Sequence, residues 1–375
     1  MELRTEVLII GGGLAGLTSA IHLAKLGKQV LLIEKHTYPQ HKVCGEYISN
    51  EVLPYLLSLN ADPAVLFPSK IQRLQVSLPN GRSCESLLPL GGFGISRYTF
   101  DNYLYEKAIE AGCKVIHNTV KQVLFIDQQF EVYTNSDTYL AKIVIGAYGK
   151  RDLLDHKLNR NFINQKSSWL AVKAHYSADH PDDLVALHNF HGGYCGVSKV
   201  ENNLVNVCYL VNYKSFKPFK HIIKHQQQVL YKNKHLKSLF ENSQMAFDSP
   251  MSISQVSFDN KERVKDHILM IGDTAGLIHP LCGNGMSMAI HAAMLCSDLV
   301  VAYLDGKITS RAALEHRYAS SWQANFDKRK KTGKVLSAIL LKPLAAKLVM
   351  EVLVSFPALF KPMIKMTHGK PILTK

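Results

Sequence analysis

The 375-residue chain lacks any C-x-x-C pair. Its seven cysteines are odd in number, so we expect reduced thiols in the cytoplasm rather than a disulfide framework, and no bound metal. The sequence also lacks repeats and low-complexity segments, and its 47% hydrophobic and 20% charged composition is typical of a globular protein. The first apolar run begins almost at the N-terminus, which argues against a signal peptide.

Acidic residues are scarce near the C-terminus. Residues 307–375 contain 14 lysines and arginines against three acids, a net charge of +11. The apolar stretch after residues 328–331 is interrupted by Pro343, Pro357 and Pro362, so it is too broken to span a bilayer as one helix. Two interpretations stay open: short helices that pack over the core, or peripheral contact of residues 328–375 with an anionic membrane. No nucleic-acid partner is expected, because the tail has no interleaved aromatics.

The beginning of the chain carries the strongest motif. An apolar run at 7–10 leads into Gly11, Gly13 and Gly16, which have G-x-G-x-x-G spacing, and an amphipathic stretch follows. A second apolar run ends at Glu34, about 20 residues beyond the glycines. The first glycine allows a tight turn, the second lets backbone approach a pyrophosphate, and the third lets the helix pack on the strand. The order strand, glycine turn, helix, strand, acid predicts a dinucleotide-binding βαβ unit.

Each part of this unit has a predicted contact with a dinucleotide. The helix N-terminus offers free N–H groups to the phosphates, and Glu34 can accept hydrogen bonds from a ribose 2′-hydroxyl. The motif is compatible with both NAD and FAD. We expect the cofactor contacts of this unit at Gly11, Gly13, Leu14, Ala15, Gly16, Glu34 and Lys35.

A downstream segment, residues 267–305, decides between these cofactors. It reads as a short buried strand, a Gly272-Asp273 pair, a P-x-x-G-x-G loop and a helix from about 286 to 304. Here the chain resembles the flavoprotein family that includes para-hydroxybenzoate hydroxylase and geranylgeranyl reductase. The resemblance implies FAD, with Asp273 on the ribityl hydroxyls, the loop beside the isoalloxazine, and the helix N-terminus at the flavin C2 carbonyl. The implied contacts are Gly272, Asp273, Pro280, Gly283, Asn284, Gly285 and Met286.

The middle of the chain continues the resemblance. Family members carry an FAD-contacting arginine ahead of a helix, and Arg97 matches it before the helix predicted at 98–111. The next segment, 115–123, is predicted to be a strand whose backbone lies near the adenine, with Val120 as the best match.

One segment favours the reductase side of the family. Residues 41–49, HKVCGEYIS, resemble the K-x-C-G-G segment that lies close to the flavin in geranylgeranyl reductases. Lys42, Cys44 and Gly45 match this segment, whereas Glu46 replaces its second glycine. Gly276 also matches the reductases at a position where aromatic hydroxylases usually carry a histidine.

The chain departs from the family in its reductant and substrate motifs. Tyr148 stands where monooxygenases have the aspartate of an A-D-G motif, so direct NAD(P)H binding stays uncertain. The segment 193–198, GYCGVS, keeps Tyr194 but lacks the Trp and Phe-Pro of the reductase Y-x-W-x-F-P segment. With Trp169 and Trp322 as its only tryptophans, the chain also lacks the W-x-W-x-I-P segment of flavin halogenases.

The sequence therefore predicts an α/β protein with a Rossmann-like FAD-binding domain of the glutathione-reductase type. We expect this domain to be discontinuous, at 1–165 and 256–305. A sheet-rich substrate domain is expected at 166–255, joined by strands from about 71–88, followed by a basic, apolar helical region at 306–375.

The resemblance implies an FAD-dependent oxidoreductase acting on a hydrophobic small molecule. The favoured reaction is reduction of a double bond in an isoprenoid- or polyketide-like substrate by hydride from reduced flavin. The alternatives are hydroxylation of an aromatic or polyketide substrate through a C4a-hydroperoxide, and a flavin-binding electron carrier, because one scaffold serves several chemistries. The proton donor is not readable from the sequence, and Cys44, Tyr194 and His279 are its candidates.

Overall fold

A computed structural model describes residues 3–373. Its first sheet has eight strands, and its parallel core runs in the order β6-β2-β1-β9-β17. Apolar runs such as Val7–Ile10 form this core because both faces of a parallel sheet are covered. The strands are β1 (Leu3–Ile10), β2 (Val30–Glu34), β6 (Lys114–His117), β7 (Gln122–Ile126), β8 (Gln129–Tyr133), β9 (Thr138–Gly146), β16 (Val264–Lys265) and β17 (Ile268–Met270).

The strand predicted at 115–123 is wrong as a single element. The chain forms β6 and β7 instead, with residues 118–121 between them. Asn118 breaks the strand, because its side-chain oxygen accepts a hydrogen bond from the backbone N–H of Thr119 at 2.8 Å. Val120 lies in this irregular connection.

Four long helices cover the first sheet: α1 (Leu14–Lys25), α3 (Arg97–Glu110), α8 (Gly285–Leu304) and α9 (Arg311–Leu340). α1 packs against α3 and α8, and α8 packs against α9. α9 belongs to the same core, since Tyr318, Trp322 and Phe326 are almost fully buried there. The basic run 328–331 therefore lies inside a 30-residue helix rather than before a set of short ones. The shorter α2 (Leu53–Ser58) and α4 (Leu153–Lys157) complete this part.

By length and composition alone, α8 could cross a membrane. It packs between α1 and α9, and 11 of its 20 residues are buried, which is the environment of a core helix.

The second sheet has nine strands in the order β14-β10-β13-β12-β11-β4-β5-β3, with β15 also paired to β10. Its strands are β3 (Tyr47–Ser49), β4 (Ser69–Ser77), β5 (Ser83–Gly94), β10 (Trp169–Ser177), β11 (Leu184–Phe190), β12 (Gly193–Lys199), β13 (Leu204–Asn212), β14 (Gln244–Met245) and β15 (Met251–Ser254). Strands from residues 47–94 thus share a sheet with strands from 169–254.

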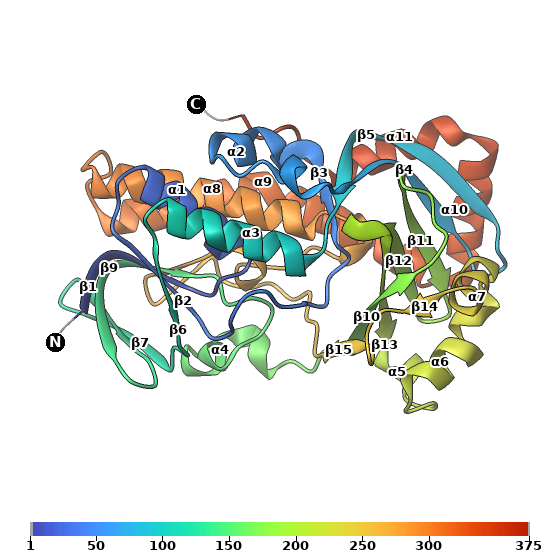
Figure 1. Cartoon of the computed structure of the whole chain (residues 1–375), viewed down its shortest axis with the longest axis horizontal. Helices are drawn as coiled ribbons and strands as arrows, with labels where there is room; N and C mark the ends of the chain where they lie inside the picture. Colours follow the sequence, from blue (N-terminus) through green and yellow to red (C-terminus); the bar gives the residue numbers. More distant parts are fainter. Residues whose placement is uncertain (1–2, 374–375) are drawn as a thin grey trace.

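Helices flank this second sheet. The segments α5 (Tyr213–Phe216) and α6 (Ile222–Gln228) lie at its lower end in Figure 1, and α7 (Lys234–Glu241) lies above them at its side. The C-terminal helices α10 (Pro343–Ser355) and α11 (Phe360–Thr367) lie against β4 and β5 (Figure 1), where Met350 and Ile364 are buried. The C-terminal helices therefore close over the second sheet, while α8 and α9 cover the first.

Candidate active site

A cavity of about 690 Å³ is lined by residues of both sheets and of α11. Every expected cofactor residue except Gly16 lines it: Gly11, Gly13, Leu14, Ala15, Glu34, Lys35, Lys42, Cys44, Gly45, Arg97, Val120, Gly272, Asp273, Pro280, Gly283, Asn284, Gly285 and Met286. Gly16 lies beneath the cavity wall, where a Cβ atom would come within 1.9 Å of the Gly11 carbonyl oxygen. Its missing side chain lets α1 approach the end of β1.

The polar end of the cavity begins at the N-terminus of α1. The N-cap residue, Gly13, supplies no side-chain cap, and the first turn has no acidic residue, so the first N–H groups are free for an outside acceptor. Glu34 is held at the end of β2, because its carboxylate accepts hydrogen bonds from the N–H groups of Gly12 at 2.6 Å and His36 at 3.0 Å. The remaining lone pairs of Glu34 can accept from a hydroxyl group.

Two cations stand beside this helix end. The Arg97 guanidinium donates twice to Asp101, at 2.6 and 2.7 Å, and the Lys42 ammonium donates to the same carboxylate at 2.8 Å. Burial would raise the pKa of the Asp101 carboxyl, but Arg97 and Lys42 together hold that pKa below its usual range. A Cβ atom on Gly13 would lie 3.4 Å from the Arg97 guanidinium, so the cations and the helix end share one space. A helix N-terminus with two cations beside it suits a pyrophosphate.

A second helix end and a carboxylate lie further along the cavity. Asp273 follows β17 in the short turn Gly272–Thr274, and its backbone carbonyl accepts from the Lys261 ammonium at 2.9 Å. α8 begins with no side-chain cap at Asn284 and no acid in its first turn. This helix end offers a partial positive charge to an electron-rich group.

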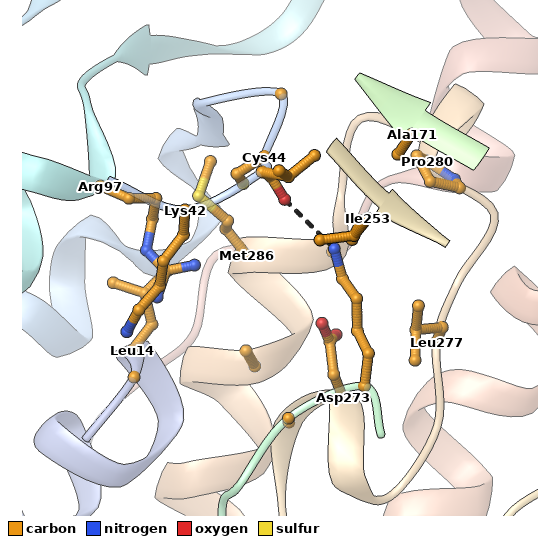
Figure 2. A pocket seen from close by; sticks show the side chains of 18 of the residues that line it. Leu14, Lys42, Cys44, Arg97, Ala171, Ile253, Asp273, Leu277, Pro280 and Met286 are labelled. Atoms are coloured by element: carbon orange, nitrogen blue, oxygen red, sulfur yellow. Dashed lines mark hydrogen bonds between the residues drawn. The ribbon is translucent and has the colours of Figure 1, made fainter. Parts of the chain in front are cut away.

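The other end of the cavity is apolar. Figure 2 shows Arg97 and Lys42 on one side of the view, Ala171, Leu277 and Pro280 on the other, and Cys44 and Asp273 between them. The apolar wall comes from the second sheet and the loops beside it, and includes Leu74, Leu88, Ala171, Val185, Leu187, Tyr194, Leu210, Ile253, Leu277 and Leu281. Residues 364, 367 and 368 of the C-terminal segment also line it. A polar elongated site thus continues into an apolar one.

The three candidate proton donors have different surroundings. Cys44 and Tyr194 line the cavity, and burial keeps the pKa of the Tyr194 phenol well above its usual value, so the phenol stays protonated. His279 does not belong to the lining residues. Its Nε2 shares a hydrogen bond with Ser337 of α9 at 2.8 Å, and burial lowers its pKa to about 4. His279 therefore ties the loop before α8 to α9 as a neutral ring.

Sequence reasoning missed the role of Glu46. Its backbone has a φ of 53°, a conformation that favours glycine, and its carboxylate is fully buried. The carboxylate accepts from the ammonium of Lys173, from His175 Nε2 at 2.6 Å and from the backbone N–H of Arg97 at 2.7 Å. Burial would raise the pKa of Glu46, but Lys173 and His175 hold it below its usual range. The sequence signal for this charge cluster is that Glu46 replaces the second glycine of the K-x-C-G-G segment.

Comparisons with known proteins agree with this geometry. The family model for FAD-dependent oxidoreductases of the DAO type matches residues 6–44. Over 344 residues the chain is 25% identical to digeranylgeranylglycerophospholipid reductase 1 of Methanopyrus kandleri, with 86% of each sequence covered.

Solved structures share the fold over nearly the whole chain. A flavin-dependent brominase matches with a TM-score of 0.79 at 18% identity, covering 97% of this chain and 93% of its own. A geranylgeranyl bacteriochlorophyll reductase-like protein of Thermoplasma acidophilum matches with a TM-score of 0.77 at 18% identity, covering 99% and 93%.

The glycine turn, the two open helix ends and these matches define an FAD-dependent oxidoreductase with a Rossmann-like FAD-binding fold. FAD is its cofactor, and the residues along the polar end fit the parts of that molecule. Its sequence is similar to that of a digeranylgeranyl lipid reductase, and its fold is shared with a geranylgeranyl reductase-like protein.

Proposed function

We propose that the protein reduces carbon–carbon double bonds in a hydrophobic, isoprenoid-like substrate. One observation carries this proposal: a single cavity joins a polar end, whose groups suit a dinucleotide, to an apolar end. The relative in Methanopyrus kandleri, named for reduction of a digeranylgeranyl lipid, supports the same substrate class. An apolar cavity of this kind selects chain shape and excludes water rather than reading polar groups.

The proposed cofactor contacts follow the donors along the polar end. Glu34 would accept from the adenosine ribose, and the α1 N-terminus, Arg97 and Lys42 would hold the pyrophosphate. Asp273 would accept from the ribityl hydroxyls, and the N-terminus of α8 would offer its partial positive charge to the ring carbonyl that gains negative charge on reduction.

The chain contributes orientation and a dry environment to the reaction. FAD, once reduced, supplies the hydride. The second sheet and α11 hold the substrate chain against the flavin and keep water out of the cavity. A proton must reach the other carbon of the double bond, and Tyr194 is the lining group that stays protonated across neutral pH.

Hydroxylation of an aromatic or polyketide substrate is the competing reaction on this fold. Anaerobic reduction of the holoprotein followed by exposure to oxygen separates the two. We expect simple reoxidation of the flavin. A long-lived C4a-hydroperoxide spectrum would instead support a monooxygenase and contradict the proposal.

We also propose that the C-terminal helices contact an anionic membrane surface, from which a lipid substrate could enter. α10 carries an outward apolar stripe at Leu344, Leu348 and Val352, which are 86%, 63% and 40% exposed. Its inner residues, Ala346 and Met350, are buried against the second sheet. The stripe continues into Phe356 and Leu359, with exposed basic residues at Lys342, Lys347, Lys361 and Lys365.

An apolar stripe rimmed by lysines is the pattern of an interfacial helix on anionic lipid. Co-sedimentation with anionic and neutral vesicles tests this surface. We expect binding to the anionic vesicles, weakened by salt. Absence of binding to either vesicle by the intact protein would mean that α10 and α11 are only a cover of the cavity.

A further inference from the structure

The segment before β3 is held by three side chains from distant parts of the chain. The carbonyl groups of Lys42, Val43 and Cys44 are consecutive, and each accepts one hydrogen bond at 3.2 Å. The donors are Lys173 of β10, Lys150 after β9 and Asn206 of β13, respectively. This segment lines the cavity beside Asp273 and the start of α8, so its three donors lie around the junction of the polar and apolar ends.

Lys150 differs from the other two donors. Lys173 is fully buried and forms an ion pair with Glu46, and Asn206 is a neutral, buried amide. Lys150 instead lines the cavity. Among the ion pairs of residues 3–373, none involves Lys150, so its charge has a backbone carbonyl as its protein acceptor and no carboxylate within 4.0 Å. Two of its three N–H donors stay available to another acceptor.

The backbone of Lys150 is fixed to the same turn that carries Asp273. The buried Lys261 ammonium donates to the carbonyls of both Lys150, at 2.6 Å, and Asp273, at 2.9 Å. The neighbouring Gly149 N–H donates to the Thr274 hydroxyl at 2.8 Å. From this anchored backbone, the side chain reaches the Val43 carbonyl on the opposite segment.

The charge of Lys150 also reaches the apolar end. Burial raises the pKa of the Cys208 thiol on β13 to about 12, and Lys173 and Lys150 are among the charges that oppose this rise. The Lys150 ammonium therefore lies at the Val43 carbonyl, in a cavity that Asp273 and Cys208 also line.

We propose that Lys150 faces the flavin ring and stabilises the negative charge that the ring gains on reduction, raising its reduction potential. The inference rests on the placement of FAD in this cavity under the proposed function. A fixed cation in a site that excludes water acts more strongly than one in solvent, and it needs no reorganisation when the charge appears. The competing explanation is purely structural: Lys150 could serve only to hold the Val43 carbonyl.

Three substitutions separate these roles. Lys150→Met removes both the charge and the hydrogen bond, Lys150→Gln removes the charge but keeps an N–H donor, and Lys150→Arg keeps the charge. The exposed Lys157→Met in α4 is the matched control for loss of one positive charge. Each variant is purified with FAD, its FAD affinity is measured by titration, and its flavin midpoint potential is measured by anaerobic dye equilibration without substrate.

We expect Lys150→Met and Lys150→Gln to bind FAD and to favour the oxidised flavin about tenfold more than the natural protein, a shift of roughly 30 mV for a two-electron couple. Lys150→Arg and Lys157→Met should keep the potential of the natural protein. Unchanged potentials in both the Met and Gln variants would overturn the proposal. If the Gln variant alone keeps the natural potential, the role of Lys150 is the hydrogen bond to the Val43 carbonyl. That result would also overturn the proposal.

Loss of FAD from both variants with the fold intact would overturn the redox role as well, since Lys150 would then be an anchor for the oxidised cofactor. The measurement needs no substrate, so it is independent of the proposed reaction. A shifted potential in a protein that reduces no isoprenoid would leave this inference standing while the proposed function fails.

Discussion

The two ends of the cavity are built in different ways. The polar end comes from turns at the ends of strands and helices, and hydrogen bonds fix its charged side chains, as at Glu34 and Arg97. The apolar end gathers residues from β4, β11, β12, β15 and α11, whose apolar side chains are held by packing. One end can therefore specify a single ligand through directional donors, whereas the other specifies shape and polarity. Substitutions should therefore have sharper effects at the polar end and at its border.

The largest effect is expected at the border between the ends, from Glu46→Ala. Removing this carboxylate leaves Lys173 and His175 buried without their acid, which should lower the free energy of unfolding by about 3–5 kcal/mol. Denaturant unfolding of the holoprotein measures it. The matched control is Glu85→Ala, whose ion pair with Arg73 is exposed and should change stability by less than about 1 kcal/mol. Equal losses of unfolding free energy in Glu46→Ala and Glu85→Ala would show that the buried Glu46 cluster does not hold the two ends of the cavity together.

At the polar end, Asp273→Ala should weaken FAD binding by about 1.5–3 kcal/mol, the scale of hydrogen bonds to a charged group. That corresponds to roughly a tenfold to hundredfold rise in the dissociation constant, measured by fluorescence titration of the apoprotein. Asp248→Ala, at an exposed position, should leave FAD affinity unchanged. An unchanged affinity in the Asp273 variant would remove the ribityl role assigned to this residue.

Away from both ends, helix α6 beside the second sheet contains a buried histidine ring that should respond to pH. His225 is fully buried, neither of its ring nitrogens has a hydrogen-bond partner in the described part of the chain, and burial lowers its pKa to about 4. The pKa of His225 is lower in the folded protein than in the unfolded chain. Between about pH 6.5 and pH 4, His225 is therefore protonated in the unfolded chain and neutral in the folded protein. Stability from this site is therefore lost as the pH falls through that range.

His225→Phe should remove this acid sensitivity, because the ring lies among Phe190, Phe216 and Phe219. We expect a gain of about 1 kcal/mol at pH 7.5, from the loss of unsatisfied polar groups, and a larger gain at pH 5. Thermal unfolding at the two pH values measures the difference. A gain that is the same at both would contradict a neutral buried His225.

The smallest effect is expected on the outer face of α11. Lys365→Gln should weaken binding to anionic vesicles by about 1 kcal/mol at low salt, roughly fivefold, and the difference should vanish at high salt. Lys232→Gln, which removes an exposed charge in the turn between α6 and α7, should bind as the natural protein does. If both variants lose binding equally, the attraction comes from the net charge of +14 rather than from the C-terminal helices.

The polar end was largely predictable from the sequence, because it is assembled from short segments that each carry a local motif. The glycine turn, Glu34, and the turn before α8 each form one local unit whose spacing reveals its geometry. The α/β class was predicted on these grounds, and FAD was predicted from the family resemblance of the turn before α8; both are confirmed by the comparisons. The roles assigned to single residues stay predictions.

Other features of the site and fold could not be found from the spacing of residues in the sequence. Lys150 and Glu46 act through partners 107 and 127 positions away in the chain, and only the folded sheets bring these groups together. The break at Asn118 depends on one side-chain hydrogen bond, which a run of apolar residues does not show. The cover over the apolar end comes from α11, whose amphipathic pattern is equally consistent with a packed or a membrane-bound helix.

A single-turnover experiment without oxygen tests double-bond reduction most directly. The holoprotein is reduced with dithionite, freed of excess reductant and mixed with a digeranylgeranyl glycerophospholipid in detergent micelles. We expect the oxidised flavin spectrum to return at a rate that rises with lipid concentration, and the lipid to gain two hydrogens for each flavin reoxidised. Flavin that stays reduced until air is admitted, with the lipid unchanged, would show that the protein does not reduce this lipid.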